Sequence, residues 1–149
     1  MNIINEMNLS FCAKSINESF ARSAISAFVL SLDPTIGELS DIKTAVSEAV
    51  TNCIVHAYGY KGGIIYINAR ITDTGKVIIR VRDKGCGMEN VKQAMEPLYT
   101  TGGEERAGLG FAVMQSFMDK VSVRSTPLKG TTVTMEKAII RCAKNDREE

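Results

Sequence analysis

The sequence has little of the features that mark several protein classes. Its 149 residues carry a net charge of +1. The chain therefore has neither the strongly basic surface that would indicate nucleic-acid binding nor the strongly acidic surface that would indicate cation binding. No apolar run is long enough to span a bilayer, and no segment resembles a signal peptide. We therefore expect a cytoplasmic protein with no membrane association and no direct contact with nucleic acid.

Two common nucleotide-binding signatures are also missing. No Gly-x4-Gly-Lys-Ser/Thr run occurs, which excludes a P-loop, and no Gly-x-Gly-x-x-Gly follows a first strand, which argues against a Rossmann unit. The four cysteines are widely separated and include no Cys-x-x-Cys pair; they are Cys12, Cys53, Cys86 and Cys142. This spacing is typical of reduced thiols and favours neither a zinc site nor a disulfide framework.

The composition that remains is that of a globular domain. Hydrophobic residues make up 44% of the chain and charged residues 23%, and 149 residues suffice for one domain with a real core. We see no internal repeat, linker or low-complexity segment, so residues 1–149 are treated as a single domain. The highly charged tail, 141–149, is expected to fray.

The first half of the chain predicts one strand and two helices. Apolar and polar residues alternate over Met7–Ala13, which predicts a strand with one buried face. Ser15 and Glu18 have the spacing of a capping box, so a helix is expected to begin there and to end before Pro34. A second helix is predicted from about Ile36 to Tyr58.

The second half predicts hairpins around two further helices. Strands over 64–71 and 76–82 are joined by a turn, and a short helix at 89–95 precedes an irregular stretch at 98–107. A third helix follows Gly108-Leu109-Gly110, and two last strands begin near 121 and 131. Because hairpins join most strands, we expect an α+β fold, a two-layer α/β sandwich whose mostly antiparallel sheet is covered on one face by helices.

The segment Asp83-Lys84-Gly85-Cys86-Gly87 follows the strand at 76–82. A carboxylate fixed where a strand becomes a loop can accept a hydrogen bond from an exocyclic amine such as that of adenine. Gly85 and Gly87 allow positive φ angles and a close approach of backbone to a ligand. Asp-x-Gly is also ordinary turn chemistry, so this segment alone leaves both interpretations open.

Glu48 and Asn52 lie four residues apart on the second predicted helix, and therefore on one flank beside its apolar stripe. An amide oxygen at Asn52 suits Mg²⁺, which takes few protein ligands and several waters and phosphates. Glu48 could then act as a general base on an attacking hydroxyl. A solvated polar flank has the same spacing, and a lone histidine such as His56 is more typical of a cap or packing residue than of a catalyst.

Four segments together resemble the nucleotide-binding boxes of the GHKL ATPases, in order and spacing. They are Glu48-x3-Asn52, Asp83-x-Gly85-x-Gly87, Gly108-x-Gly110 and Gly130-Thr131-Thr132. One box is weak support, but four in sequence over residues 48–132 are specific. The resemblance implies a Bergerat-type ATP-binding fold, with ATP or ADP and Mg²⁺ as cofactors.

Four further segments narrow the resemblance, at 17–22, 32–35, 46–52 and 117–119. They are similar to the anti-sigma-F family of sporulation proteins over nearly the whole chain. Membership would imply an ATP-dependent protein serine kinase that also inhibits a sigma-F-type sigma factor in a nucleotide-dependent way and phosphorylates its anti-anti-sigma antagonist on serine. It also implies a homodimer, with residues 1–35 as the partner and dimer region and with Arg22 and Glu18 contacting partners.

The resemblance assigns a role to each site residue. Glu48 would be the general base and Asn52 the Mg²⁺ ligand, while Asp83 would bind the adenine amino group. The other nucleotide contacts expected are Gly85, Gly87, Thr132, Gly108, Leu109 and Gly110, the last three as backbone N–H donors where a helix opens toward the phosphates.

A lid over the nucleotide is expected at residues 96–107. Thr100, Thr101 and Arg106 are candidates there for gating and γ-phosphate contact, although Arg106 fits a solvated loop charge equally well. The run Gly102-Gly103-Glu104-Glu105 is shorter and richer in glycine than the family pattern, which affects the phosphate contacts expected of the lid but not the nucleotide site.

Two alternatives to a serine kinase remain. One is the catalytic ATP-binding domain of a histidine kinase, which the sequence disfavours because its one histidine, His56, lies inside the nucleotide-binding segment. The other is a module that binds nucleotide without catalysing a reaction.

Overall fold

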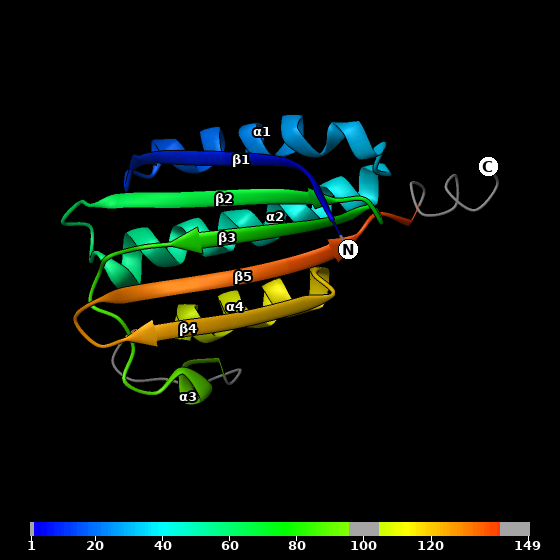
Figure 1. The fold of residues 1–149 in the computed structure, drawn as a ribbon. Coiled ribbons are helices and arrows are strands. Elements are labelled where there is room, and N and C mark those ends of the chain that lie inside the picture. The colour runs from blue at the N-terminus through cyan, green and yellow to red at the C-terminus, as the bar shows by residue number, and fades with distance from the viewer. Residues whose placement is uncertain (1, 96–104, 141–149) are drawn as a thin grey trace.

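The computed structural model describes residues 2–95 and 105–140, with side chains from 110 onward in the second range, and shows a sheet and helices in two layers (Figure 1). The strands are β1 (Ile3–Cys12), β2 (Ile64–Thr72), β3 (Lys76–Arg82), β4 (Lys120–Thr126) and β5 (Gly130–Ala138). The helices are α1 (Ile16–Val29), η1 (Leu30–Leu32), α2 (Ile36–Asn52), η2 (Cys53–Ala57), α3 (Val91–Met95) and α4 (Glu105–Phe117).

The strands form a five-stranded sheet in the order β1-β2-β3-β5-β4, and every neighbouring pair is antiparallel. Helices α1, α2 and α4 lie side by side against one face of it (Figure 1). The predicted α+β sandwich is therefore confirmed, including β1 as a strand with alternating exposure at one edge of the sheet. An edge strand leaves backbone groups unpaired on one side.

The core fills the space between the sheet and the helices. Alternate residues of the central strands point inward because successive side chains on a strand face opposite ways. The largest buried members are Ile25, Ile42, Ile65, Ile67, Ile71, Ile79, Met114, Met135 and Ile139. This packing holds α2 and α4 against each other and against the sheet, and so fixes the functional site.

The start of α1 differs from the sequence prediction. Ser15 precedes the helix, but its side chain makes no capping hydrogen bond. Glu18 is turned instead toward α2, where it accepts hydrogen bonds from the hydroxyls of Ser47 and Thr51. The predicted capping box is therefore wrong, because the Glu18 carboxylate is hydrogen-bonded to two hydroxyls of the neighbouring helix and not to the start of its own helix.

Helix α2 begins with a capping box of its own. Thr35 accepts a hydrogen bond from the Glu38 backbone N–H at 3.0 Å, and Glu38 accepts one from the Thr35 N–H at 2.9 Å. The α-helix ends at Asn52 and continues as a π-helical turn, η2, before Tyr58. The prediction of one helix to Tyr58 thus has the right extent, but its last turn is wider, as is frequent near functional sites.

Helix α4 begins earlier than expected, at Glu105. The last three residues of the predicted lid are therefore its first turn, and Gly108 and Gly110 lie within the helix and do not precede it. The rest of the lid, 96–104, and the charged tail, 141–149, fall outside the described residues.

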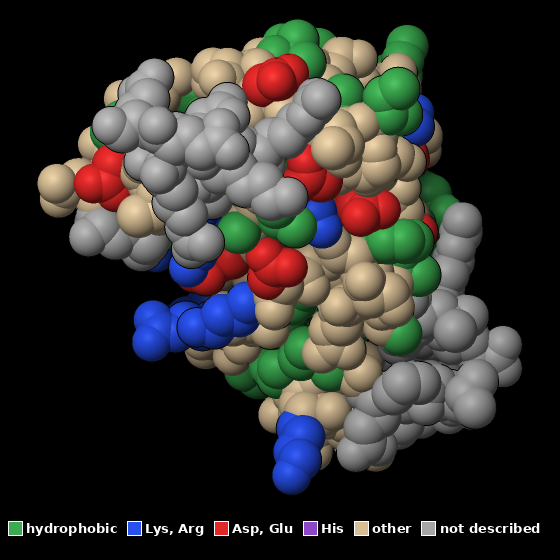
Figure 2. All heavy atoms as spheres, turned by 90° about the vertical axis from the view of Figure 1, so that its right-hand side faces the viewer, with side chains coloured by type: hydrophobic (Ala, Val, Ile, Leu, Met, Phe, Trp, Pro, Cys, Tyr) green, Lys and Arg blue, Asp and Glu red, His purple; other side chains and the backbone are tan. Residues whose placement is uncertain are grey.

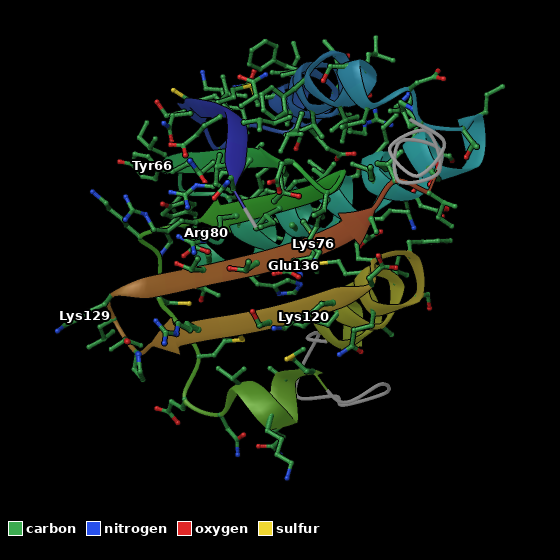
Figure 3. All side chains as sticks on the ribbon, turned by 45° about the vertical axis from the view of Figure 1, so that its right-hand side comes forward. Tyr66, Lys76, Arg80, Lys120, Lys129 and Glu136 are labelled. Atoms are coloured by element: carbon green, nitrogen blue, oxygen red, sulfur yellow. The ribbon has the colours of Figure 1, made fainter. Side chains whose placement is uncertain are left out.

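The face of the sheet opposite the helices is polar. Figure 3 labels residues on four of its strands, among them Tyr66, Arg80 and the ion pair that Lys76 makes with Glu136 at 3.5 Å. The Arg82 guanidinium lies 4.9 Å from the centre of the Tyr66 ring. A broad hollow of about 880 Å³ lies over this face, and among the predicted site residues that the structure describes, Thr132 alone lines it.

Charges of both signs are mixed over the surface. The face of the molecule in Figure 2 carries acidic and basic side chains close together, with hydrophobic side chains between them. Among the residues that the structure describes, no helix is long and apolar enough to cross a membrane.

Candidate functional site

Glu48 and Asn52 stand together on α2, facing α4. A Cβ added at Gly110 would lie 3.2 Å from the Glu48 Oε2 atom and 3.3 Å from both terminal atoms of the Asn52 amide. At Gly110, α4 therefore lies close to these side chains, and any larger residue there would push against them. The structure thus brings together both named residues of one predicted box and one glycine of another.

The Asn52 amide has an unused hydrogen-bonding atom. Its Nδ2 atom is buried and has no hydrogen-bond partner. Buried polar groups are nearly always hydrogen-bonded, so an orphaned amide beside a carboxylate indicates that a ligand completes the site. Because the oxygen and nitrogen of an amide can exchange places by a flip, Asn52 can offer either a donor to a phosphate or an oxygen to a cation.

Asp83 follows β3 directly, as predicted, and the residue is only 5% exposed. Its Oδ1 atom accepts hydrogen bonds from the backbone N–H groups of Gly85 at 2.9 Å and Thr131 at 3.2 Å. The Cys53 thiol donates to Oδ2 at 3.6 Å. Oδ1 is thus held by the backbone, while Oδ2 has only a weak donor and keeps acceptor capacity for a ligand.

Burial controls the protonation of this pair. It raises the pKa of the Asp83 carboxyl above 3.8, although the hydrogen bonds from Gly85, Thr131 and Cys53 oppose the rise. Burial also raises the pKa of the Cys53 thiol well above 9.0, and the neighbouring Asp83 adds to this. Cys53 therefore remains a protonated donor at neutral pH.

The glycines after Asp83 allow the loop to approach two other segments. A Cβ at Gly85 would lie 2.3 Å from the Ala57 carbonyl oxygen, at the end of the π-helical turn. Gly87 has a φ of +70°, and a Cβ there would lie 2.1 Å from the Thr126 carbonyl oxygen. Side chains at these positions would force the loop away from η2 and from the β4–β5 turn.

A small cavity of about 110 Å³ lies between these elements. It is lined by Ala49, Asn52, Cys53, His56, Ala57, Asp83, Cys86, Gly87, Met88, Ala94, Phe111, Thr131 and Val133. Apolar walls with one buried carboxylate are what a flat heteroaromatic ring with an amino group requires. The volume is far below that of a drug-sized pocket, so it suits one ring of a larger ligand.

Two neighbouring threonines of the last predicted box lie on opposite sides of the sheet. Thr131 lines this cavity, whereas Thr132 lies on the other side of β5 and lines the hollow over the open face of the sheet. Neighbouring residues on a strand point to opposite faces. The signal was present in the sequence, because Thr131 is in phase with the inward-facing Val133 and Met135.

For several predicted nucleotide contacts the structure describes only the backbone or nothing. Thr100 and Thr101 lie outside the described residues. Arg106, Gly108 and Leu109 lie in the first turns of α4, where the backbone is described. Gly108 is thus three residues beyond the helix start, at the end of the first turn.

The residues fit a bound Mg²⁺ through Asn52. Among the described residues, no three His, Cys, Asp or Glu side chains are gathered as a complete metal site. Mg²⁺ does not need such a cage, since it is usually held by one or two protein oxygens together with phosphates and water. The orphaned Asn52 amide is the group that would hold it.

Glu18 and Arg22 lie on the side of α1 that faces α2. The Arg22 Nε atom is 4.0 Å from the Glu18 carboxylate, and it is buried without a hydrogen-bond partner. Sequence reasoning missed Ser47 and Thr51, the hydroxyl residues that bind Glu18 and directly precede Glu48 and Asn52. No local pattern reveals this pairing, because 29 and 33 residues separate the partners.

Comparison with known proteins accounts for this arrangement. The family model described as "Histidine kinase-like ATPase domain" matches residues 14–137. An anti-sigma F factor of Caldanaerobacter subterraneus subsp. tengcongensis is 61% identical over 92% of this chain and 96% of its own length. The chain belongs to the anti-sigma F factor family of histidine kinase-like ATPases. An ATPase domain of this kind implies nucleotide binding.

More distant relatives agree. The anti-sigma F factor of Halalkalibacterium halodurans is 52% identical over 92% of the chain and 94% of its own length. Among solved structures, the RsbU and RsbW domains of a Mycobacterium tuberculosis protein match 91% of this chain with a TM-score of 0.65 at 18% identity, over 32% of that longer chain. A histidine kinase domain from Erythrobacter litoralis matches 89% of this chain and 65% of its own, with a TM-score of 0.55 at 15% identity. These two similarities concern the fold alone.

Proposed function

We propose that this protein is an anti-sigma factor and an ATP-dependent serine kinase. It binds and inhibits a sigma-F-type sigma factor of sporulation in a nucleotide-dependent way, and it phosphorylates the anti-anti-sigma antagonist of that sigma factor on serine. The relatives are anti-sigma F factors, which supports the sigma-factor partner. Both partners would be met in the cytoplasm, and the homodimer expected from the family remains part of the proposal.

The position of Glu48 is the observation that carries the kinase assignment. Its carboxylate lies against Gly110 and beside Asn52, which lines the small cavity, and Glu48 itself lines a hollow on the surface of α2. A module that only held a nucleotide would have no need of a carboxylate there. A base must be within hydrogen-bond reach of the proton it takes, and the partly exposed flank of α2 gives an outside hydroxyl access to it.

Each residue then has one task in the transfer. Asp83 accepts a hydrogen bond from the adenine amino group at Oδ2, which orients the nucleotide. Asn52 holds the Mg²⁺ that neutralises phosphate charge when it is bound. Glu48 takes the proton of the acceptor hydroxyl while the hydroxyl oxygen attacks the γ-phosphorus. The bond between that phosphorus and the β,γ-bridging oxygen breaks, and ADP leaves.

The experiment is transfer from γ-labelled ATP to proteins of sporulating cells, with wild type and Glu48→Gln compared. We expect a labelled protein with alkali-sensitive, acid-stable phosphoserine, and a 10²- to 10⁴-fold lower rate for the variant, the usual contribution of general base catalysis. Nucleotide affinity should not change. Asp41→Ala is the matched control, since Asp41 lies on the same helix but pairs with Lys137 at 3.4 Å.

Each other outcome contradicts a part of the proposal. Acid-labile label on histidine would support a histidine kinase domain, whose fold this chain shares. Absence of any labelled protein would support a nucleotide-binding module. A Glu48→Gln variant that transferred at the wild-type rate would exclude Glu48 as the base. For the anti-sigma activity, a pull-down with ATP, with ADP and without nucleotide should recover a sigma factor in amounts that depend on the nucleotide.

A further inference from the structure

The open face of the sheet, opposite the helices, carries two hollows that share part of their lining. The hollow of about 880 Å³ lies over the strands, and a second one of about 660 Å³ lies beside it, at the loop after β3 and the β4–β5 turn. Arg82, Arg124 and Thr132 line both, so the two hollows form one continuous depression, which we call the sheet trough. Figure 3 shows Tyr66 and Arg80 on this face and Lys129 at the β4–β5 turn.

The register of the strands arranges the lining of the trough in two rows across the sheet. One row is Ser10, Tyr66, Arg82, Thr132 and Arg124, and the next is Asn8, Asn68, Arg80, Thr134 and Ser122. Residues two apart on a strand face the same way, so both rows point to the open side. Neither row contains an acidic residue, and the floor of the trough is made of cations, hydroxyls and amides.

The basic side chains of the trough are exposed and unpaired. They are Arg80, Arg82, Lys84, Arg124 and Lys129. None of them makes an ion pair with any residue that the structure describes. The acidic residues on the same face of the strands lie one row further along, and each is already neutralised. Glu6 pairs with Arg70 at 2.8 Å, and Glu136 pairs with Lys76 at 3.5 Å.

This distribution changes what the net charge of the chain implies. The value of +1 led to the expectation of no direct contact with nucleic acid, but a net charge is a sum over the whole surface and does not describe how charges are distributed. Cations gathered on one face repel one another, and an anion bound among them removes this repulsion. The sheet trough is therefore a candidate site for a polyanion.

Tyr66 holds two of these cations in place. The Arg82 guanidinium lies 4.9 Å from the centre of the Tyr66 ring, and the Lys84 ammonium lies 5.0 Å from it. A cation–π contact orients a charged group without using its N–H donors, so both groups can still donate to phosphate oxygens. Because these long side chains are already ordered, less conformational entropy is lost when an anion binds.

The chemistry of the lining favours nucleic acid over an acidic protein. Protein interfaces depend on apolar and aromatic anchors near their centre. The aliphatic residues that line the hollow over the strands, Leu9 and Ile67, pack instead into the core between the sheet and the helices. Interfaces with nucleic acid are more polar and much more positively charged, and arginines and hydroxyls are the groups that contact phosphates.

We propose that the sheet trough binds single-stranded nucleic acid through its phosphates, without reading its sequence. The strand crosses the sheet from Tyr66 on β2 toward Lys129 at the β4–β5 turn. A single strand fits because the cations line a depression, whereas a duplex is read by an element that protrudes into one of its grooves. The nucleotide cavity lies on the other side of the sheet, so this site is separate from the kinase reaction.

The salt dependence of binding tests the proposal. The probe is a fluorescein-labelled oligothymidine of about 15 nucleotides, near the upper end of the site sizes of small single-strand-binding domains. Fluorescence anisotropy at a series of KCl concentrations should give a Kd of about 10⁻⁶–10⁻⁴ M at physiological salt. The slope of log K against log salt should be about −3.5, since each of the five cations contributes about −0.7 on a single strand.

A double variant, Arg80→Gln with Arg124→Gln, removes two of these cations. Its slope should be shallower by about 1.4, and its affinity at low salt at least about tenfold weaker. The matched control is Lys14→Gln with Lys43→Gln, which removes the same charge from residues that line neither hollow and should bind like wild type. Affinity for ADP should be the same in all three proteins, because a folding defect would lower it.

A further measurement locates the bound strand. Oligothymidine that carries 5-iododeoxyuridine should crosslink on irradiation to the peptide that contains Tyr66, the aromatic residue in the lining of the trough. Crosslinks confined to the helices, or an unchanged salt slope for the double variant, would overturn the site. Binding of polyglutamate with equal affinity would overturn the assignment to nucleic acid, and equal affinity for a duplex of the same length would overturn the assignment to a single strand.

Discussion

Asp83 and Thr131 are hydrogen-bonded to each other twice, although 48 residues separate them. The Asp83 N–H donates to the Thr131 carbonyl at 2.9 Å, and the Thr131 N–H donates to Asp83 Oδ1 at 3.2 Å. This exchange joins the end of β3 to the start of β5. It leaves Oδ2, which only a thiol contacts, as the oxygen available to a ligand.

Asp83→Asn is expected to weaken binding of adenine nucleotides about 10- to 100-fold. Oδ1 keeps its two backbone donors, but the amide nitrogen at the other position would face the amino group of adenine, donor against donor. Loss of a hydrogen bond to a charged group costs about 1.5–3 kcal/mol. Isothermal titration with ADP measures the change, and an unaltered affinity would remove Asp83 from the adenine site.

The same variant should change how stability depends on pH. Burial raises the pKa of Asp83 in the folded protein, so the folded state binds a proton more readily than the unfolded state. The contribution of this group to stability is complete below pH 3.8 and decreases as the pH rises through the folded pKa. Compared with wild type, Asp83→Asn should therefore gain unfolding free energy as the pH rises through this window. Chemical unfolding of both proteins at a series of pH values tests this, and parallel curves would contradict it.

Gly110→Ala is expected to reduce phosphoryl transfer about 10- to 100-fold without loss of stability. The added methyl would lie 3.2–3.3 Å from Glu48 and Asn52, so both must move by a few tenths of an ångström, and small misplacement of reacting groups is costly. Alanine also favours the helix by up to about 1 kcal/mol. Thermal unfolding and transfer rates measured together test this.

The control for that substitution is Gly37→Ala, in the first turn of α2. A Cβ there would have its nearest neighbour, the Thr35 hydroxyl, at 3.9 Å, so this variant should gain helix propensity and keep full activity. Equal activity of the two variants would mean that contact between Gly110 and the α2 side chains is unimportant.

Gly87→Ala should destabilise the fold by about 3 kcal/mol. Alanine at a positive φ costs about 1–2 kcal/mol, and overlap with the Thr126 carbonyl at 2.1 Å adds an overpacking cost of about 1–3 kcal/mol. Gly59→Ala isolates the first contribution, because Gly59 has a φ of +55° with nothing within 4 Å. Urea unfolding should show Gly87→Ala as clearly the less stable, and equal losses would mean that the loop yields freely.

Arg22→Ala should weaken capture of a protein partner at least tenfold and leave nucleotide affinity unchanged. Arg22 lies on α1, beside the hollow that Glu48 also lines and away from the cavity that holds Asp83. Arg80→Ala, on the open face of the sheet, is the matched control. Binding of the sigma factor recovered in the pull-down measures the effect, and wild-type binding by Arg22→Ala would exclude it as an anchor.

The sequence by itself determined the architecture and which residues make up most of the candidate site. Alternation at Met7–Ala13 and the hairpin turns defined the sheet, since side-chain period and turn residues are local properties. Helix periodicity placed Glu48 beside Asn52, and the end of a strand placed Asp83, because side-chain direction is a local property. Family resemblance then supplied their roles.

Only the tertiary structure decided which of several locally equivalent choices is realised. Glu18 could cap its own helix, but because α1 packs on α2 its carboxylate accepts hydrogen bonds from Ser47 and Thr51. Thr131 and Thr132 are equally suited to a polar contact, and the pairing of β5 in the sheet turns Thr131 inward. The hollow that Arg22 and Glu48 line also exists only because two helices pack, and such long-range contacts leave no local signal in the chain.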